Sequence, residues 1–257
     1  MTIAARALDI GYPGRVVGRS LELALGDGEV LCILGPNGSG KTTLLRTLLG
    51  LIPALGGTVS VDGADIRGMA RERLAREIAY VPQASSAAFD FTAGEVVLMG
   101  RTAHMGAFSP PSRRDRDLAR AALDRLGIGE LAQRAITAVS GGERQLVLIA
   151  RALATGARAI VMDEPTANLD FGNQARVLGQ VAALRDAGVS ILLCTHDPGH
   201  AFQVADRVLL LREGRAITLA RAEEALTAEN LSALYGVPVH VAQVATAAGM
   251  RRVCVRV

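Results

Sequence analysis

Apolar and polar residues alternate along three stretches near the N-terminus. Residues 7–10 and 21–25 place apolar side chains at alternating positions, and residues 59–63 repeat the pattern. A period of two residues matches a strand that buries one of its faces. The pattern therefore predicts half-buried antiparallel strands in this part of the chain.

Three other short stretches, residues 30–34, 160–163 and 191–195, are apolar almost throughout. Strands that are buried on both faces of a parallel sheet have this composition. Apolar residues at helical spacing occur in residues 44–49, 117–126, 145–153 and 174–184. The alternation of buried strands with helices predicts an α/β fold in which helices wrap a parallel sheet.

The C-terminal part of the chain has a different pattern. Residues 208–211 and 216–219 flank a Glu213-Gly214 turn, which predicts a hairpin. Residues 222–235 predict a helix, and two short strand-like pieces follow it. The tail is too short for a separate regulatory barrel, so we expect a packing appendage and a candidate contact with a partner subunit.

Composition sets limits on the class of protein. The chain has 257 residues, half of them apolar, which is enough for one large domain or two small ones. The net charge is only +3 and aromatic residues make up 3%, which leaves few side chains for stacking bases and disfavours a nucleic-acid partner. The charges of residues 113–117 alternate in sign, which favours a solvated helix start over a disordered segment or a nucleic-acid patch.

The three cysteines and the apolar runs bear on where the protein works. Cys32 and Cys194 lie in strand-like runs and no C-x-x-C is present, so we expect buried free thiols in a reducing cytosol. Residues 1–9 lack the pattern of a secretory signal. The apolar runs are far shorter than the roughly 20 residues that span a bilayer. If the protein serves a membrane, another chain must cross it.

A glycine-rich loop follows the first buried strand. The run Gly35-Pro-Asn-Gly-Ser-Gly-Lys-Thr42 fits the pattern G-x-x-x-x-G-K-[ST] of a phosphate-binding loop. Lys41 is the only lysine among 28 basic residues, and a compact ammonium fits between phosphate oxygens better than a guanidinium does. The strand before the loop and the helix after it favour nucleotide binding over an ordinary glycine-rich turn. We expect Lys41 on the β and γ phosphates and the Thr42 hydroxyl on Mg²⁺.

Two acidic residues end the strand at residues 160–163. Asp163 and Glu164 would stand at the carboxyl edge of the sheet, where ligands bind in open α/β folds. Such a pair alone is typical of a solvated loop. Behind a phosphate loop, it indicates that Asp163 holds Mg²⁺ and that Glu164 polarises the attacking water.

A second helix start carries exposed backbone amides. Ser140 and Glu143 have the spacing of a capping box, and Gly141 and Gly142 lie between them. The two glycines leave backbone amides exposed at the positive end of the helix, which predicts a second surface that binds phosphate. One nucleotide would then be gripped from two sides.

Over about residues 5–215, the chain resembles the ATP-binding subunits of ABC transporters. The resemblance is carried by the phosphate loop, the Ser-Gly-Gly motif, the Asp-Glu strand and a histidine after residues 191–195. The resemblance implies a P-loop NTPase (RecA-like) core with an antiparallel β subdomain, residues 1–86 and 156–217. It also implies a helical signature subdomain, 87–155, and leaves residues 218–257 as a C-terminal appendage of the same domain.

The resemblance also implies roles for single residues. Gln83 matches the glutamine that contacts Mg²⁺ and the attacking water, His196 matches the histidine on the γ-phosphate, and both would join Glu164 in catalysis. ATP would be sandwiched between two copies in a head-to-tail dimer, and Tyr12 would stack on adenine. The residues expected to contact ATP are Tyr12, Gly35, Pro36, Asn37, Gly38, Ser39, Gly40, Lys41, Thr42, Thr43, Ser140, Gly141, Gly142 and Asp170. Those expected around Mg²⁺ are Thr42, Gln83 and Asp163.

Residues 91–101, 141–153, 170–174 and 234–237 narrow the resemblance to importers of metal chelates. The implied cargo is an iron–siderophore complex, haem or cobalamin, with molybdate or tungstate close behind. An integral-membrane permease and an external substrate-binding protein would be partners, and the protein would lie on the cytoplasmic face of the inner membrane. We expect residues 89–101 to contact a permease helix.

Two departures and two alternatives remain. Val139 stands where the family usually has leucine, and Glu143 where it has glutamine. Soluble relatives of these ATPases act on nucleic acid, ribosomes or iron–sulfur scaffolds, and an exporter with a separate membrane subunit is a third class. The absence of long coiled-coil insertions and the single set of motifs in the sequence disfavour the soluble class, and the exporter stays open.

Overall fold

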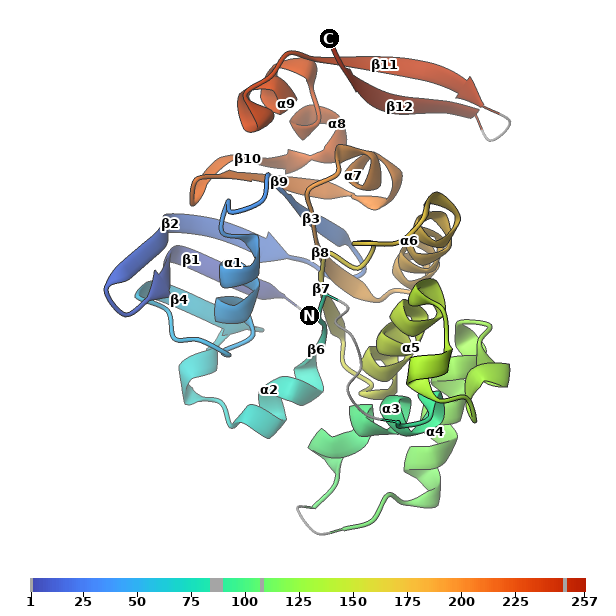
Figure 1. Cartoon of the computed structure of the whole chain (residues 1–257). Helices are drawn as coiled ribbons and strands as arrows, with labels where there is room; N and C mark the ends of the chain where they lie inside the picture. The colour runs from blue at the N-terminus through green and yellow to red at the C-terminus, as the bar shows by residue number, and fades with distance from the viewer. Residues whose placement is uncertain (1, 84–89, 107–108, 247–248) are drawn as a thin grey trace. The chain divides into compact units, whose positions relative to one another are not determined.

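The structure of the chain is a computed structural model that describes residues 2–83, 90–106, 109–246 and 249–257. The chain divides into two compact units, and Figure 1 labels helices and strands of both. The first unit is formed by Met1–Arg67 together with Ser190–Val257, and the second by Gly68–Val189.

The first unit contains the antiparallel sheet that the alternating pattern predicts. Its strand order is β2-β1-β4-β5. In β1, Leu8 and Ile10 are buried while Ala7 is exposed and Asp9 is half-buried, because successive side chains of a strand point to opposite faces. The strands are β1 (Ile3–Tyr12), β2 (Arg15–Leu25), β4 (Gly56–Val61) and β5 (Ala64–Asp65).

A second set of strands in this unit is parallel. β3 pairs in parallel with both β8 and β9, and β10 pairs antiparallel with β9. Every residue of β3 and β8 is buried, which confirms the prediction from their apolar runs. The hairpin expected around Glu213-Gly214 is also confirmed. The strands are β3 (Val30–Leu34), β8 (Ser190–Thr195), β9 (Arg207–Arg212) and β10 (Arg215–Arg221), and the helices are α1 (Lys41–Leu48) and α7 (Pro198–Val204).

The tail completes the first unit. The single helix predicted for residues 222–235 is wrong, because the chain forms α8 (Ala222–Ala225) and α9 (Ala228–Tyr235). Thr227 separates them, since it adopts an extended conformation and its side chain accepts a hydrogen bond from the Asn230 amide as the N-cap of α9. The two strand-like pieces form an antiparallel pair, β11 (Val239–Thr246) and β12 (Gly249–Arg256).

The tail shares a hydrophobic core with the parallel strands. Leu226, Leu231 and Leu234 are buried in one cluster with Cys32 of β3 and Leu210 of β9. The expected packing of the tail is therefore confirmed. Burial raises the pKa of the Cys32 thiol to about 12, against the opposing effect of the Lys41 charge, so this free thiol stays protonated at neutral pH.

The second unit combines one parallel strand pair with the helices of the middle of the chain. β6 pairs with β7 in parallel. The helices α4 and α5 begin earlier than the periodicity predicts, because capping boxes at Ser112 and Ser140 start them. The strands are β6 (Ile78–Val81) and β7 (Ala159–Asp163), and the helices are α2 (Arg71–Glu77), α3 (Ala93–Leu98), α4 (Arg113–Arg125), α5 (Gly141–Ala154) and α6 (Phe171–Asp186).

The boundaries of the two units differ from the subdomain boundaries expected at residues 86, 155 and 217. β6, β7 and α6 group with the helices in Gly68–Val189, because their contacts run mainly to α5 and to each other. The subdomain division of the family stays a prediction for this chain.

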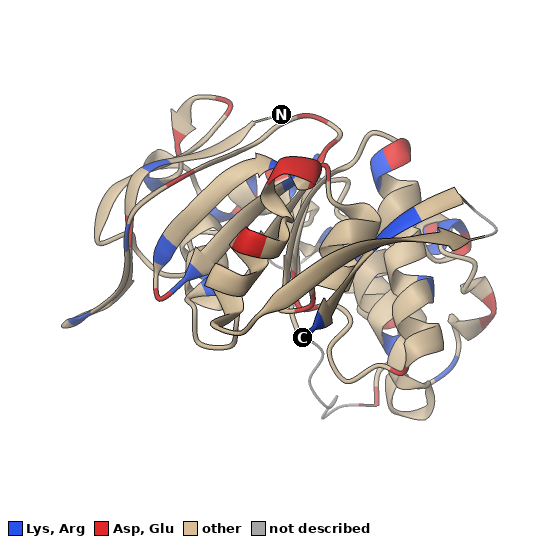
Figure 2. Cartoon of the chain, turned by 90° about the horizontal axis from the view of Figure 1, so that it is seen from above, with Lys and Arg blue, Asp and Glu red and all other residues tan. Residues whose placement is uncertain are grey.

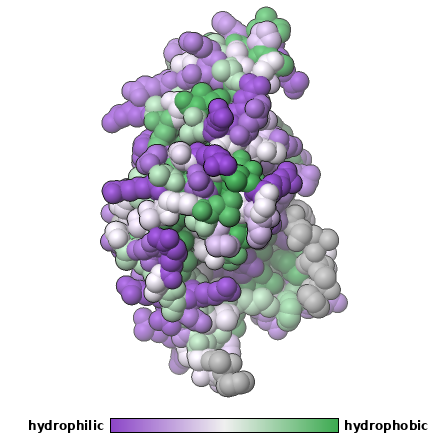
Figure 3. All heavy atoms as spheres, turned by 90° about the vertical axis from the view of Figure 1, so that its left-hand side faces the viewer, coloured by the Kyte–Doolittle hydropathy of each residue, from purple (hydrophilic) through white to green (hydrophobic). Residues whose placement is uncertain are grey.

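Charged residues and hydrophobic residues are both spread over several parts of the molecule. Basic and acidic residues are distributed over the strands and helices (Figure 2). On the face drawn in Figure 3, hydrophilic and hydrophobic residues are interspersed. Among the described residues, no helix combines the length and the apolar character needed to cross a bilayer.

Candidate functional site

The phosphate loop closes around its lysine. Lys41 is the first residue of α1 and only 5% of its surface is exposed. Its Nζ donates hydrogen bonds to the carbonyl oxygens of Gly35, at 2.8 Å, and Pro36, at 3.1 Å. The loop therefore holds the ammonium where bound phosphate would meet it. A phosphate oxygen is a stronger acceptor for it than a neutral carbonyl, because both partners then carry charge.

The loop is packed too closely to accept a larger residue at its first position. A Cβ at Gly35 would lie 2.1 Å from the carbonyl oxygen of Leu211 and 2.7 Å from Oγ of Ser39. Ser39 is buried, and its hydroxyl has no hydrogen-bond partner within the described part of the chain. A buried hydroxyl without a partner is unfavourable, so a ligand oxygen at this position would be stabilised.

The turn between β9 and β10 is hydrogen-bonded to the phosphate loop. Gly214 donates its N–H to the Ser39 carbonyl, at 3.0 Å, and accepts a hydrogen bond from the Arg19 N–H, at 3.3 Å. Gly214 has φ 72°, and a Cβ there would lie 1.8 Å from the Val17 carbonyl oxygen. Only glycine can occupy this position, and sequence reasoning missed its role because it read the pair Glu213-Gly214 as an ordinary turn.

The phosphate loop and His196 leave the same edge of the parallel strands. Leu34 at the end of β3 pairs with Thr195 at the end of β8, and the Gly35 N–H donates to the Thr195 carbonyl, at 3.3 Å. The next residue, His196, is exposed. The structure therefore brings His196 beside the start of the loop, as expected for strand ends that face one ligand.

The backbone around His196 is tightly held. The Thr195 hydroxyl bonds to Nδ1 of the buried His200, at 2.9 Å, and accepts from the Asp197 N–H, at 3.1 Å. Burial lowers the pKa of His200 more than the nearby Asp197 carboxylate raises it, so this ring is neutral at pH 7. The hydroxyl of Tyr235 donates to the His196 carbonyl, at 2.8 Å.

The other predicted nucleotide contacts of the first unit lie on or near the loop. Thr42 is exposed at the start of α1, while Thr43 is buried beneath it. Tyr12 ends β1 and is 38% exposed, which leaves part of its ring accessible for stacking. Its contact with adenine stays a prediction.

In the second unit, Gln83 and the two acidic residues leave neighbouring strands at one edge. Val81 of β6 pairs with Met162 of β7, and each predicted residue follows one or two positions later. Gln83 is exposed, Asp163 is buried at 3% exposure, and Glu164 is half-buried. The side-chain oxygens of Gln83 and Asp163 suit Mg²⁺, a hard cation that prefers oxygen ligands.

Glu164 adopts a strained backbone conformation. Its φ is 47°, in the left-handed region that favours glycine. Its carbonyl accepts a hydrogen bond from the Ala167 N–H, at 3.0 Å, which closes a turn after β7. Strain of this kind persists where surrounding structure enforces it and is concentrated at functional sites.

The capping box predicted at Ser140 is confirmed. Its hydroxyl accepts from the Glu143 N–H, at 3.2 Å, and the Glu143 carboxylate accepts from the Ser140 N–H, at 2.8 Å. These hydrogen bonds from Ser140 lower the pKa of Glu143 and keep it ionised. Ser140 and Gly141 are exposed at the start of α5, the positive end of the helix, where an anion is stabilised.

Asp170 lies at the start of α6, which contacts the start of α5. The contact is made by Asn173, a residue that sequence reasoning missed. Asp170 caps α6, and its carboxylate accepts from the backbone N–H and from Nδ2 of Asn173, each at 2.8 Å. These bonds lower the pKa of Asp170. A Cβ at Gly142 would lie 2.1 Å from Oδ1 of Asn173, so the two helix starts are in direct contact. In the sequence, the only feature that pointed to Asn173 was its position within residues 170–174, one of the stretches that narrow the resemblance.

One expectation about the partner surface is corrected. Phe91 and Met99 are each 42% exposed, as a permease contact would require. Arg101 is buried, however, and its Nε lies 3.0 Å from Oδ1 of Asp115 in an ion pair. The start of α4 is therefore not fully solvated, and Arg101 is not part of an exposed surface. Phe89 lies outside the described residues.

Known proteins resemble this chain over most of its length. Residues 19–167 match the family described as ABC transporter. An uncharacterized ABC transporter ATP-binding protein of Haemophilus influenzae is 42% identical over 91% of this chain and 89% of its own length. The cobalamin import ATP-binding protein of Halobacterium salinarum is 36% identical over 94% of this chain, which spans 60% of that protein.

Solved structures give the same result. A protein described as a metal-chelate type ABC transporter, in an inward-facing conformation, superposes with a TM-score of 0.90 and is 33% identical over all of this chain and 97% of its own. The fold is therefore the α/β P-loop NTPase fold with an antiparallel β subdomain, as predicted. The chain belongs to the ABC transporter family, as an ATP-binding ATPase subunit of the group that includes metal-chelate transporters.

Proposed function

We propose that this chain hydrolyses ATP to power the uptake of a metal chelate through a separate permease. The observation that carries the proposal is the shared strand edge in the first unit. The Gly35 N–H bonds to the Thr195 carbonyl, so the Lys41 loop and His196 start from adjacent positions. A phosphate cradle beside a histidine suits recognition of a nucleotide triphosphate.

Each candidate residue has a distinct task in this proposal. The amides of residues 35–43 and the Lys41 ammonium bind the phosphates. Thr42, Gln83 and Asp163 hold Mg²⁺, which when bound neutralises charge on the phosphate oxygens. Glu164 orients and polarises the attacking water, and His196 contacts the γ-phosphate. Catalysis then consists mainly of positioning and electrostatic stabilisation.

The exposed start of α5 supports a head-to-tail dimer. Ser140, Gly141 and Gly142 offer a second anion-binding helix N-terminus, while the sequence carries one phosphate loop. In the proposed dimer, Ser140 of one subunit completes the site that holds ATP on Lys41 of the other. Tyr12 stacks on adenine, and Asp170 lies at the crossing between the two sites.

Cargo and location rest on the relatives. Proteins 33–38% identical to this chain are named for import of iron(3+)-hydroxamate, haemin and molybdate, and one is named for manganese transport. An iron chelate, haem or cobalamin is our first candidate, and molybdate or tungstate is close behind. The protein would bind a permease at the cytoplasmic face of the inner membrane, with an external substrate-binding protein supplying the cargo.

The replacement Glu164→Gln tests the catalytic assignment. Loss of the carboxylate removes a general base, so steady-state ATP hydrolysis should fall by about 10² to 10⁴-fold. ATP affinity should stay within about twofold, since the phosphate loop is untouched. Hydrolysis at the normal rate in this variant would refute the role of Glu164.

Co-purification tests the transport assignment. The tagged chain, expressed in its own cells and extracted with detergent, should recover a polytopic permease, and the complex in vesicles should couple ATP hydrolysis to uptake of a metal chelate. Recovery of a nucleic-acid particle, a ribosome or a soluble iron–sulfur scaffold would contradict the proposal and support a soluble ABC ATPase.

A further inference from the structure

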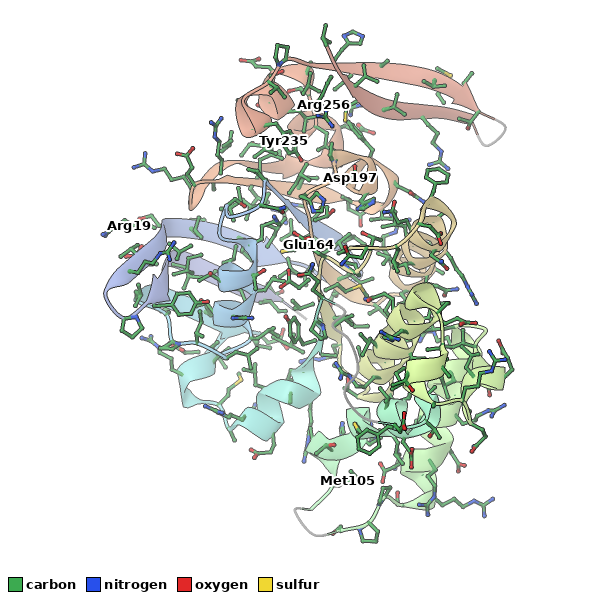
Figure 4. The ribbon with its side chains drawn as sticks, viewed as in Figure 1. Arg19, Met105, Glu164, Asp197, Tyr235 and Arg256 are labelled. Atoms are coloured by element: carbon green, nitrogen blue, oxygen red, sulfur yellow. The ribbon has the colours of Figure 1, made fainter. Side chains whose placement is uncertain are left out.

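The last helix of the tail ends against the backbone of His196. Tyr235 is the C-terminal residue of α9, and its hydroxyl donates to the His196 carbonyl, at 2.8 Å. The two residues are 39 positions apart in the sequence. Figure 4 labels Tyr235, near α9 of the tail, and Asp197, the neighbour of His196, at the start of α7. The tail therefore contacts the segment that carries a candidate catalytic side chain.

The carbonyl that Tyr235 binds lies just beyond the end of a strand. Thr195 is the last residue of β8, and its own carbonyl is held by the Gly35 N–H. Its hydroxyl is held by His200 and Asp197. The His196 carbonyl belongs to the same peptide group as the Asp197 N–H, and it accepts a hydrogen bond from the phenol of the tail. The Thr195 hydroxyl and the Tyr235 phenol therefore bind the two ends of this peptide group, and loss of the phenol removes one of the hydrogen bonds that fix the backbone carrying the imidazole.

Tyr235 is itself well placed to act as a fixed donor. Its ring packs against the buried cluster that includes Cys32 and Leu34 of β3, the strand that leads into the phosphate loop. Burial raises the pKa of its phenol well above the usual range, with a smaller contribution from the Asp197 carboxylate, so the hydroxyl keeps its proton. Arg212 of β9 donates to the Ala233 carbonyl and holds the end of α9 in place.

We propose that Tyr235 is a positioning residue for ATP hydrolysis, which acts by fixing the backbone of His196. This proposal rests on the proposed role of His196 at the γ-phosphate and deepens it. The tail is then part of the catalytic unit as well as a packing element. Correct seating of α9 on the β3–β9 core sets the position of the imidazole, so a displaced tail lowers turnover before it lowers ATP binding.

A double-mutant cycle tests this proposal. The isolated full-length protein is assayed for kcat and for KM of ATP as wild type, Tyr235→Phe, His196→Ala and the double variant. Tyr235→Phe removes one hydroxyl and keeps the buried ring. Loss of one neutral hydrogen bond should lower kcat by roughly threefold to tenfold, with KM within about twofold. In the His196→Ala background, the same replacement should change kcat by less than about 1.5-fold, because its effect passes through the imidazole.

Ser232→Ala is the matched control on the same helix. The Ser232 hydroxyl donates to the Ala228 carbonyl and accepts from the Val239 N–H, so its loss weakens the tail without touching His196. This variant should lower the thermal midpoint while kcat stays within about twofold of wild type. The control separates general loosening of the tail from a lost contact to His196.

The possible outcomes separate the two proposals. If His196→Ala is impaired while Tyr235→Phe retains wild-type kcat, the positioning role is wrong and the role of His196 stands. An equal loss of kcat from Tyr235→Phe in both backgrounds would also overturn positioning, since the effect would not pass through His196. Full activity of His196→Ala would refute the proposed role of His196, and the role of Tyr235 with it.

Discussion

Glu164 combines the proposed chemistry of the site with the strain of its backbone. Its φ of 47° lies in the left-handed region, which disfavours a non-glycine residue by roughly 1–2 kcal/mol. The turn closed by Ala167 enforces this conformation directly after the buried Asp163. The strain keeps a carboxylate at a position where glycine would fit more easily, which is the pattern expected of a functional residue.

This strain predicts a stability difference between two inactive variants. Glu164→Gly should have a free energy of unfolding about 1 kcal/mol higher than Glu164→Ala, because glycine relieves the left-handed strain and alanine retains it. Both should hydrolyse ATP slowly, since both lack the carboxylate. Urea denaturation of the two variants measures the difference. A more stable alanine variant would show that the turn does not strain this residue.

Single residues also show how far the sequence could be interpreted. Lys41, Ser140 and Asp163 were found because short motifs at the ends of apolar runs identify them. The contact between Tyr235 and His196 could not be found in this way, since it joins residues 39 positions apart and depends on how the tail packs. The burial of Arg101 was missed for the same reason, because its partner Asp115 belongs to another helix.

At the scale of elements, the buried ion pair of Arg101 and Asp115 connects three segments of the second unit. Asp115 accepts hydrogen bonds from Ser112 in the capping box of α4, and Arg101 of the 3-10 helix η2 (Met99–His104) donates to the Ala154 carbonyl at the end of α5. Hydrogen bonds from Ser112 and then from Arg101 lower the pKa of Asp115 from 3.8 to about 2.

The lowered pKa of Asp115 predicts how stability depends on pH. A carboxyl group with a depressed pKa in the folded state contributes stability that is fully present above its unfolded pKa, 3.8, and is lost as the pH falls toward 2. Asp115→Asn should therefore be less stable than wild type at pH 7, and the difference should narrow between pH 4 and pH 2. Denaturant unfolding at several pH values measures it.

Asp117→Asn is the control for this prediction. Asp117 and its partner Arg113 are exposed on the same helix, 4.0 Å apart, so the pair contributes little. The control should unfold within about 0.5 kcal/mol of wild type at pH 7. If the Asp115 variant differed from wild type by the same amount at every pH, the ionised Asp115 would not be the source of the effect.

The type of each element could be predicted better than its limits. Strands β3, β7 and β8 were predicted within one residue, since a continuous apolar run admits few other readings. The apolar spacing of α4 begins at Asp117, but the helix begins at Arg113, within the charged residues 113–117 interpreted as a helix start, because Ser112 and Asp115 form a capping box. The break at Thr227 is likewise a capping effect within a stretch of helical periodicity.

At the scale of the whole molecule, the two compact units carry different parts of the proposed machinery. The first unit holds the phosphate loop and His196, and the second holds Gln83, Asp163, Glu164 and the exposed start of α5. The proposed head-to-tail dimer accounts for a chain that carries both a phosphate loop and the exposed start of α5. In the proposed dimer, the helix start serves the nucleotide of the other subunit.

The measurement that tests this central claim most directly is complementation between two inactive variants. Lys41→Ala removes the cradle lysine, and Ser140→Arg blocks the start of α5, so each variant alone should have little ATPase activity. A dimer that pairs a Lys41→Ala subunit with a Ser140→Arg subunit contains one complete ATP site. An equimolar mixture should recover roughly a quarter of the wild-type rate, since half of random pairs are mixed and each holds one intact site of two. A mixture no more active than the separate variants, or full activity of Ser140→Arg as a monomer, would contradict the head-to-tail account.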